Sequence, residues 1–265
     1  MQGDTTLNDT LALMRDLRKR CDWDRAQTHD SLRPYLLEEA HELDDAIRNG
    51  DAAQMRGELG DVLLQVVFHA VIAEERGEFD AADVAAALIA KMRARHPHLY
   101  GGGERRAWEE MKAEQRRSIE AGLPRGLPAL HRAHRLQDRA SGVGFDWTDT
   151  EGPAAKVAEE LEEVRELLQA QRNSASTQEN ASPSAEAAEM QRALEEELGD
   201  LLFAVVNLCR RAGVHASLAL DRANAKFVRR FEAMEQLADA QGRALRELSM
   251  AEMDELWEAV KAARS

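Results

Sequence analysis

Residues 58–70, ELGDVLLQVVFHA, combine an apolar helix with an acidic beginning. Glu58 and Asp61 are three residues apart, so a helix presents both carboxylates on one face. Gly60 lies between them, although glycine in a helix costs about 1 kcal/mol relative to alanine. The pattern returns as ELGDLLFAVV at 197–206, with seven of the ten positions identical. One such acidic pair is compatible with chance, whereas two copies indicate a functional reason.

Nearly the whole sequence is typical of α-helices, because Ala, Leu, Glu, Arg and Gln dominate and alternating β-type runs are absent. Capping residues, Gly and Pro predict where the helices begin and end. The predicted helices span about 6–20, 31–49, 51–77, 80–96 and 128–141, with others after 101–103 and from about 153.

The second half of the chain repeats the order of the first. GFDW at 144–147 resembles CDW at 21–23, and KVAEELEEVREL at 156–167 resembles YLLEEAHELDDA at 35–46. A period of about 120–140 residues is too long for a solenoid and fits a duplicated domain. We therefore expect an all-α protein built from two tandem helical-bundle domains.

The expected domains are residues 1–120 and 121–265, with GLPRGLP at 122–128 as the hinge between them. Residues 171–189 are rich in Ser, Ala, Asn, Gln and Glu and have no apolar period, which predicts a flexible insertion in the second copy.

Composition excludes several classes of protein. The net charge of −14 argues against general nucleic-acid or anionic-membrane binding and suits a protein that collects cations. Cys21 and Cys209 form no CxxC pattern, which suggests a reducing cytosol. We expect no signal segment and no membrane helix, because no apolar run reaches about 18 residues.

Each copy offers two carboxylate pairs on successive helices. In the first copy, Glu39 and Glu42 would face Glu58 and Asp61 across an antiparallel pair of helices. Four carboxylates in a bundle core cannot all stay ionised without compensation. A hard divalent cation provides it, and Mg²⁺ prefers oxygen ligands. Gly60 would leave room there for a ligand or a neighbouring helix, as would Gly199 in the second copy.

An isolated EELEE segment is usually a solvated helix face. The metal hypothesis therefore depends on the occurrence of both acidic motifs, in the same order, in each half of the chain. The ELGD helix differs from such a segment because it is apolar almost all round. Glu58, Asp61, Gln65 and His69 form one polar stripe along it, which should face something polar, solvent included.

Basic and aromatic residues also repeat, at i, i+4 spacing. In an acidic protein such cations suit an anionic ligand, and tryptophan stacks on a base or packs in a core. Taken singly, each is more often a surface cation or a core tryptophan. The candidates are Lys91, Arg95, Trp108 and Lys112 in the first copy, and Lys226, Arg230, Trp257 and Lys261 in the second.

A metal site beside phosphate-binding cations suggests metal-assisted attack of water on a phosphoanhydride. The P-loop pattern GxxxxGK[ST] and the GxSxG elbow are absent. His131 and His134 have loosely metal-like spacing, as do His96 and His98, but a structural or surface role is expected for both pairs. Asn207 follows the acids on the same stripe and reaches either the ligand or the core.

The chain resembles the MazG family of nucleoside triphosphate pyrophosphohydrolases, of the two-domain type. The resemblance extends over nearly the whole chain and rests on CDWDRAQTHDSL, EExxE followed by ExxD, RHPHLYGG, GLPALHRA, GVGFDW and NAKFVRRFE. It implies the all-α NTP pyrophosphatase fold, a homodimer, and Mg²⁺-dependent cleavage of NTP or dNTP, ATP included, into a nucleoside monophosphate and pyrophosphate.

The resemblance also implies roles for particular residues. The metal ligands would be Glu160, Glu163, Glu197 and Asp200, with Glu39, Glu42, Glu58 and Asp61 matching the same motif in the first copy. Lys226, Arg230, Trp257 and Lys261 would hold the nucleotide. The flanking Glu159 and Glu196 would orient water. The second copy is the preferred catalytic site, because its cations lie on a longer predicted helix.

Two other readings remain open. A di-iron carboxylate bundle needs two Glu-x-x-His motifs, and only Glu38 and His41 supply one. An acidic helical dimer that binds nucleotide or a protein without turnover is supported by charge and helical content alone.

Overall fold

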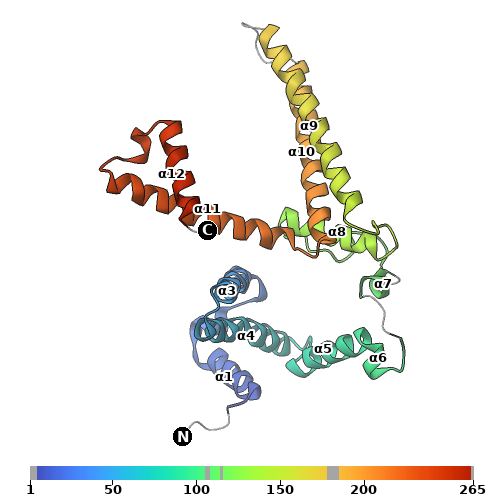
Figure 1. Cartoon of the computed structure of the whole chain (residues 1–265). Helices are drawn as coiled ribbons and strands as arrows, with labels where there is room; N and C mark the ends of the chain where they lie inside the picture. The colour runs from blue at the N-terminus through green and yellow to red at the C-terminus, as the bar shows by residue number, and fades with distance from the viewer. Residues whose placement is uncertain (1–4, 105–107, 114–115, 178–184, 264–265) are drawn as a thin grey trace. The chain divides into compact units, whose positions relative to one another are not determined.

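The computed structural model describes residues 5–104, 108–113, 116–177 and 185–263 (Figure 1). The described residues form helices and no strands, which confirms the all-α prediction. The helices are α1 (Leu7–Arg20), α2 (Asp22–Ala26), α3 (His29–Asn49), α4 (Ala52–Glu75), α5 (Ala81–Arg95), α6 (Pro97–Tyr100), α7 (Trp108–Ala113), α8 (Ala129–Ser141), α9 (Glu151–Thr177), α10 (Ala185–Arg211), α11 (Ala216–Ala240), the 3₁₀ turn η1 (Leu245–Glu247) and α12 (Met250–Ala262).

The chain divides into two compact units, Met1–Arg105 and Arg106–Ser265. The sequence places the boundary after residue 120 instead. Contacts with α8 explain the difference, because Glu109 of α7 pairs with Arg135 of α8 at 2.8 Å. Arg139 of α8 also donates to the carbonyl oxygen of Ile119 at 2.6 Å. These contacts tie the segment before residue 120 to the second unit.

In the first unit, α3 and α4 form a helical hairpin. The side chain of Thr28 caps α3, and Gly50 ends it in the left-handed conformation at φ 71°. Asp51 then caps α4. A turn this short makes the two helices antiparallel neighbours. Their apolar faces bury a core with α1, made of Met14, Leu32, Val67, Phe68, Val71 and Ile72.

The second unit contains a longer hairpin, α9 with α10, which packs on α8 (Figure 1). The two helices of this hairpin contradict part of the predicted flexible insertion at 171–189. Helix α9 runs to Thr177 and α10 begins at Ala185, so 171–177 and 185–189 are helical. Residues 185–189, AEAAE, are good helix formers, which accounts for the start of α10 there. Residues 171–177, QRNSAST, are helical although Asn, Ser and Thr have low helix propensity. Residues 178–184 lie outside the described part of the chain.

Among the described helices, none is by itself both long and apolar enough to cross a membrane. Only α10 and α11 taken together, a pair bent by 101°, meet the criteria of length and composition.

Candidate functional site

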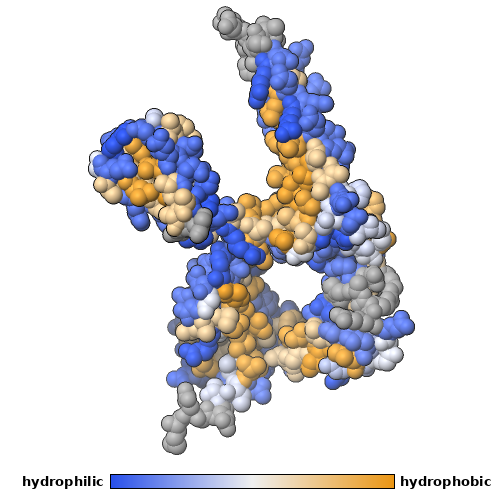
Figure 2. Space-filling model, viewed as in Figure 1, coloured by the Kyte–Doolittle hydropathy of each residue, from blue (hydrophilic) through white to orange (hydrophobic). Residues whose placement is uncertain are grey.

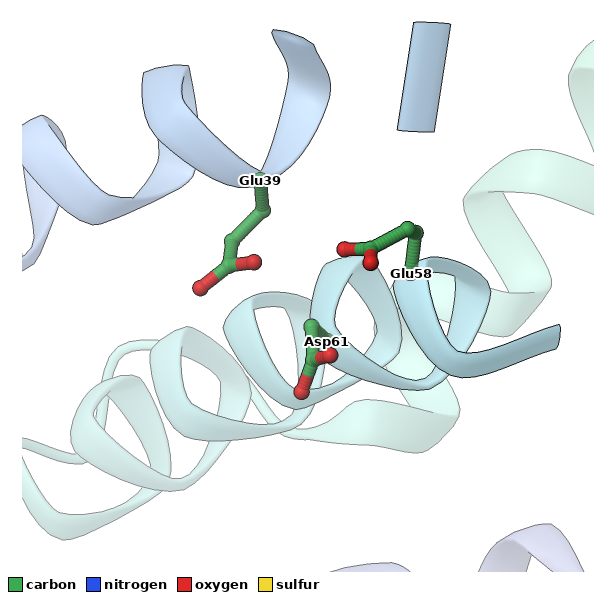
Figure 3. Close-up of side chains that lie close together, drawn as sticks. All are labelled: Glu39, Glu58 and Asp61. Carbon is green, nitrogen blue, oxygen red and sulfur yellow. The ribbon is translucent and has the colours of Figure 1, made fainter. Parts of the chain in front are cut away.

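The first unit brings together three of the four predicted acids. Glu39 projects from α3 toward Glu58 and Asp61 on α4 (Figure 3). One carboxylate oxygen from each residue lies within 4.8 Å of the others. Glu39 and Glu58 are half-buried and Asp61 is exposed. The hairpin therefore converts two separate i, i+3 spacings into one carboxylate cluster.

The electrostatics of this cluster reflect crowded negative charge. Partial burial raises the pKa of Glu39, and the charges of Asp61, Glu42 and Glu58 raise it further. The pKa of Glu58 is also raised, first by partial burial and then by Glu42 and Asp61. Glu42 interacts with Glu58 through a side-chain hydrogen bond, so the fourth predicted acid adjoins the cluster.

The second unit repeats the arrangement across α9 and α10. Oxygens of Glu160, Glu197 and Asp200 lie within 4.8 Å of one another. Glu160 is buried, with 5% of its surface exposed. The pKa of Glu163 is raised by desolvation, by a hydrogen bond with Glu160 and by the charge of Glu197. Glu163 therefore adjoins this cluster as Glu42 adjoins the first.

A lysine distinguishes the second cluster from the first. Lys156 Nζ lies 2.6 Å from Glu160 Oε1 and 2.8 Å from Glu159 Oε1. Both glutamates raise the pKa of Lys156, with Glu159 the larger contributor. The matching position in the first copy is Tyr35. Glu159 thus pairs with Lys156 at the edge of the cluster. Glu196 is exposed and lies next to Glu197 in the sequence.

Both clusters fit a hard divalent cation. Each presents converging carboxylate oxygens, the ligands that Mg²⁺ and Ca²⁺ prefer. The pKa values of Glu39, Glu58 and Glu163 are raised first by desolvation and then by neighbouring carboxylates, and a bound cation would offset both effects. The acidic clusters are thus compatible with metal use, and nothing in the donor set selects one hard cation over another.

The polar stripe on α4 meets α3 at its two ends. Beyond the acids, Gln65 is 4% exposed and His69 lies against His29 of α3. The two Nδ1 atoms are 2.7 Å apart and the rings are stacked. A side chain added at Gly60 would have no neighbour within 4 Å, and the same holds at Gly199 of the second unit. The open space predicted beside these glycines is therefore present.

The predicted cations of the second copy lie on α11 and α12. Lys226 is exposed and Arg230 half-buried, and neither makes an ion pair with a residue that the structure describes. Trp257 packs against Phe227, with ring centroids 5.6 Å apart. Lys261 pairs with Glu258 at 2.6 Å. Trp257 therefore has a packing role, and its contact with nucleotide stays a prediction.

The four predicted cation and aromatic positions of the first copy do not belong to one unit. Lys91 and Arg95 lie on α5 of the first unit, whereas Trp108 and Lys112 lie on α7 of the second. Lys112 is half-buried, and the side chain of Trp108 lies outside the described residues. Their joint role in binding nucleotide stays a prediction.

Several polar contacts were not anticipated from the sequence. Asp146 of the GFDW segment binds Arg210 of α10, with one contact between Nη1 and Oδ2 at 3.1 Å. The Lys156–Glu160 contact has an i, i+4 spacing that was open to prediction. His215 packs on His131 and His134, with centroids 4.9 and 4.4 Å apart. The histidine pair of α8 therefore belongs to a cluster of three rings.

Comparison with known proteins agrees with this arrangement. The model of the MazG nucleotide pyrophosphohydrolase domain matches residues 27–100 and 151–234, one segment in each copy. The chain is 44% identical over 262 residues to the nucleoside triphosphate pyrophosphohydrolase/pyrophosphatase MazG of Thermotoga maritima, which covers 96% of this chain and 94% of that protein. It is 42% identical over 261 residues to the nucleoside triphosphate pyrophosphohydrolase of Escherichia coli K12, and this match covers 94% of this chain and 93% of that protein.

Both matched segments contain their acidic cluster, and the two relatives are matched over almost their full length. The chain therefore belongs to the MazG nucleotide pyrophosphohydrolase family.

Proposed function

We propose that this chain hydrolyses nucleoside triphosphates between the α and β phosphates, releasing a nucleoside monophosphate and pyrophosphate. The observation that carries the proposal is the carboxylate cluster held by a helical hairpin in each segment that matches the family. Both full-length relatives are named nucleoside triphosphate pyrophosphohydrolases.

The acids would hold Mg²⁺, which when bound supplies charge neutralisation at the phosphates and lowers the pKa of a water nucleophile. Glu160, Glu197 and Asp200 provide the converging oxygens, with Glu163 beside them. Glu159 and Glu196 flank the cluster and would orient the attacking water. Lys226 and Arg230 would bind the phosphate chain, because no described residue already pairs with them.

The second copy is the preferred catalytic site. Lys226 and Arg230 lie within α11, a helix of 25 residues, whereas Arg95 is the last residue of α5, which has 15. Its cluster also has the more buried acid, Glu160. Charge in a water-poor site interacts more strongly than charge in solvent.

We further propose a homodimer that works in the cytosol without a nucleic-acid partner. Figure 2 shows apolar side chains gathered along the α9–α10 hairpin. Leu198, Leu202 and Val205 of α10 are 41%, 58% and 38% exposed. Contiguous exposed apolar surface of this kind is typical of an interface. The net charge of −14 disfavours binding to phosphate backbones.

Product analysis tests the proposal. Purified protein is incubated with Mg²⁺ and each NTP or dNTP, the nucleotides are separated and pyrophosphate is assayed. We expect monophosphate and pyrophosphate in equal amounts. Glu163→Ala should abolish turnover, and its first-copy counterpart Glu42→Ala should leave most of it. A diphosphate with inorganic phosphate would show that the wrong bond was assigned, and binding without turnover would contradict the enzyme.

A further inference from the structure

We infer that a small cavity of the second unit binds an oxyanion of the phosphate class, at arginines that belong to neither acid cluster. The cavity has a volume of about 270 Å³, and its lining includes Arg116, Arg117 and Arg139. Arg139 lies on α8, and the other two lie in the segment that joins α7 to α8. A volume below the usual range for drug-sized ligands suits a phosphate or pyrophosphate group rather than a whole nucleotide. The inference goes beyond the proposed hydrolysis and does not depend on it.

Arg139 is a buried cation whose charge has no partner. It is 6% exposed, and its Nη1 donates to the carbonyl oxygens of Ile119 at 2.6 Å and Ala121 at 3.1 Å. Its Nε is buried without a hydrogen-bond partner, and its Nη2 donates to no described residue. None of the described carboxylates forms an ion pair with it. A buried charge without an ionic partner is strongly destabilising, so an anion at this side chain would be stabilising.

A second buried arginine, Arg18 of the first unit, shows which interaction Arg139 lacks. Arg18 is 8% exposed, and its Nη1 also donates to two carbonyl oxygens, those of Asp24 at 2.6 Å and Gln27 at 3.2 Å. Its Nε and Nη2 then bind the two carboxylate oxygens of Glu75, at 2.8 and 2.6 Å. Arg139 has the same bonds at Nη1 and no carboxylate at the Nε–Nη2 edge. An oxyanion with two oxygens would bind that edge in the same bidentate way.

The surroundings of the cavity carry an excess of positive charge. Among the described residues that line it there is no carboxylate. The nearby Glu109 is shared between Arg116, at 2.6 Å, and Arg135, at 2.8 Å. Burial lowers the pKa of Arg139, the charges of Arg116 and Arg135 lower it further, and Glu109 offsets only part of this. In a protein with a net charge of −14, such a local excess of cations needs an explanation, and a bound anion supplies one.

The number of unpaired charges favours a phosphate group over a carboxylate. Arg117 is exposed and, like Arg139, forms no ion pair with a residue that the structure describes. These two arginines together leave two positive charges at the cavity. A phosphate group carries about 1.5 to 2 negative charges at neutral pH, whereas a carboxylate carries one. Guanidinium groups also match the geometry of phosphate oxygens. The ligand is therefore a phosphate group, present either as a free inorganic anion or as part of a nucleotide.

Calorimetric titration of the full-length protein with pyrophosphate in EDTA tests the inference. Under these conditions the acid clusters hold no cation and repel the anion, so binding reports on arginines and lysines. We expect the wild type to bind, and Arg139→Lys, which keeps the charge but loses the guanidinium fork, to bind roughly tenfold or more weakly. Arg117→Met should weaken binding by a similar factor. Because the side chain of Arg117 is exposed, this variant should keep the wild-type fold.

Two further variants separate the cavity from other cations of the second unit. Arg125→Met is the matched control, because Arg125 is an exposed arginine between α7 and α8 that does not line the cavity. It should bind pyrophosphate as the wild type does. Lys226→Met removes a phosphate-binding cation of the proposed active site and should leave pyrophosphate binding in EDTA largely unchanged. Binding that is lost in Lys226→Met but kept in Arg117→Met and Arg139→Lys would overturn the inference.

The same titration with inorganic phosphate and with a nucleoside monophosphate identifies the source of the phosphate group. We expect the free inorganic anions to bind at least as tightly as the monophosphate, because the cavity has no room for a nucleoside. Tighter binding of the monophosphate, weakened by the same variants, would overturn the free anion as the ligand. A wild type that binds none of the three would overturn the site itself. If pyrophosphate binds through Arg117 and Arg139 but no nucleotide is hydrolysed, the proposed function fails and the anion site stands.

Discussion

Lys156 Nζ lies 2.6 Å from Oε1 of Glu160, the buried acid of the second cluster. The two residues are four apart on α9, so a single helix face brings the cation to the carboxylate. The matching residues of the first copy are Tyr35 and Glu39, so that cluster has no lysine at this position. The second cluster thus carries its own partial compensation for buried negative charge.

Replacing Lys156 should show how much its pairing with Glu160 stabilises the protein. We expect Lys156→Met to lower the free energy of unfolding, because the change leaves the buried carboxylate of Glu160 without its cation. Urea unfolding in EDTA measures the change. Arg165→Met is the matched control, since Arg165 pairs with Glu162 on the same helix and both are well exposed. Equal losses for the two variants would contradict a special role for Lys156.

Substitution of the two ELGD glycines, Gly60 and Gly199, tests whether the open space beside them affects stability, activity or both. A side chain at Gly199 would have no neighbour within 4 Å. Gly199→Ala should therefore raise the free energy of unfolding by about 0.5–1 kcal/mol, through helix propensity alone. If the open space admits the substrate, the same change should lower kcat/KM. Gly60→Ala supplies the comparison in the first copy, and an unchanged kcat/KM in Gly199→Ala would show that the space is not used.

Much of the fold follows from local signals in the sequence. Asp51 and Asp80 cap α4 and α5 where predicted, because N-caps depend on residues a few positions away. The acids of each cluster were predicted from their i, i+3 spacing and from the hairpin that joins them. In both cases the information lies within one helix or one short connection.

Other features depend on contacts between distant residues and were not predictable in this way. The cavity beside Phe203 requires α8 and the GFDW loop to pack on α10. The unit boundary follows from the pairing of Glu109 with Arg135, 26 residues apart. Helical periodicity does not report which surfaces meet across such separations. The cavity and the division of the first copy's cations therefore appear only in the structure.

The unit boundary predicts how truncations behave. We expect a fragment of residues 106–265 to fold and keep its acid cluster. A fragment of residues 121–265 should be less stable, because it loses the contact of Glu109 with Arg135 and that of Arg139 with Ile119. Circular dichroism during heating compares them, and we expect a midpoint lower by several degrees for the shorter fragment. Equal midpoints would support the boundary after residue 120.

Cation binding should stabilise the protein. Because the pKa of Glu58 is raised by partial burial, Glu42 and Asp61, replacing it with a neutral amide relieves repulsion. In EDTA, Glu58→Gln should therefore melt at a higher temperature than the wild type. Magnesium should raise the wild-type midpoint in a concentration-dependent way, and less so in Glu58→Gln.

Glu78→Gln, an exposed acid of the first unit outside the cluster, is the control for that experiment. It should melt at the wild-type temperature in EDTA and respond fully to magnesium. A wild type whose midpoint is insensitive to every divalent cation would rule out a metal site at the carboxylates.

The three-histidine cluster predicts a loss of stability in mild acid. Burial lowers the pKa of His131 and of His134, which favours the neutral rings in the folded protein. The titratable and charged groups that face them are His215, Arg135, Arg210 and Asp138, and only Asp138 favours protonation. The unfolded chain binds protons at a pKa near 6.5, above the folded value. The stabilisation is therefore complete above pH 6.5 and is lost as pH falls toward the folded pKa.

Urea unfolding at several pH values between 5 and 7.5 measures this loss, with His134→Gln as the variant, since glutamine keeps a polar side chain that does not titrate. We expect the free energy of unfolding to fall less steeply with acidification in His134→Gln than in the wild type. His98→Gln is the control, because His98 lies on α6, in the first unit. A wild-type slope that survives in His134→Gln but not in His98→Gln would show that other groups cause the acid sensitivity.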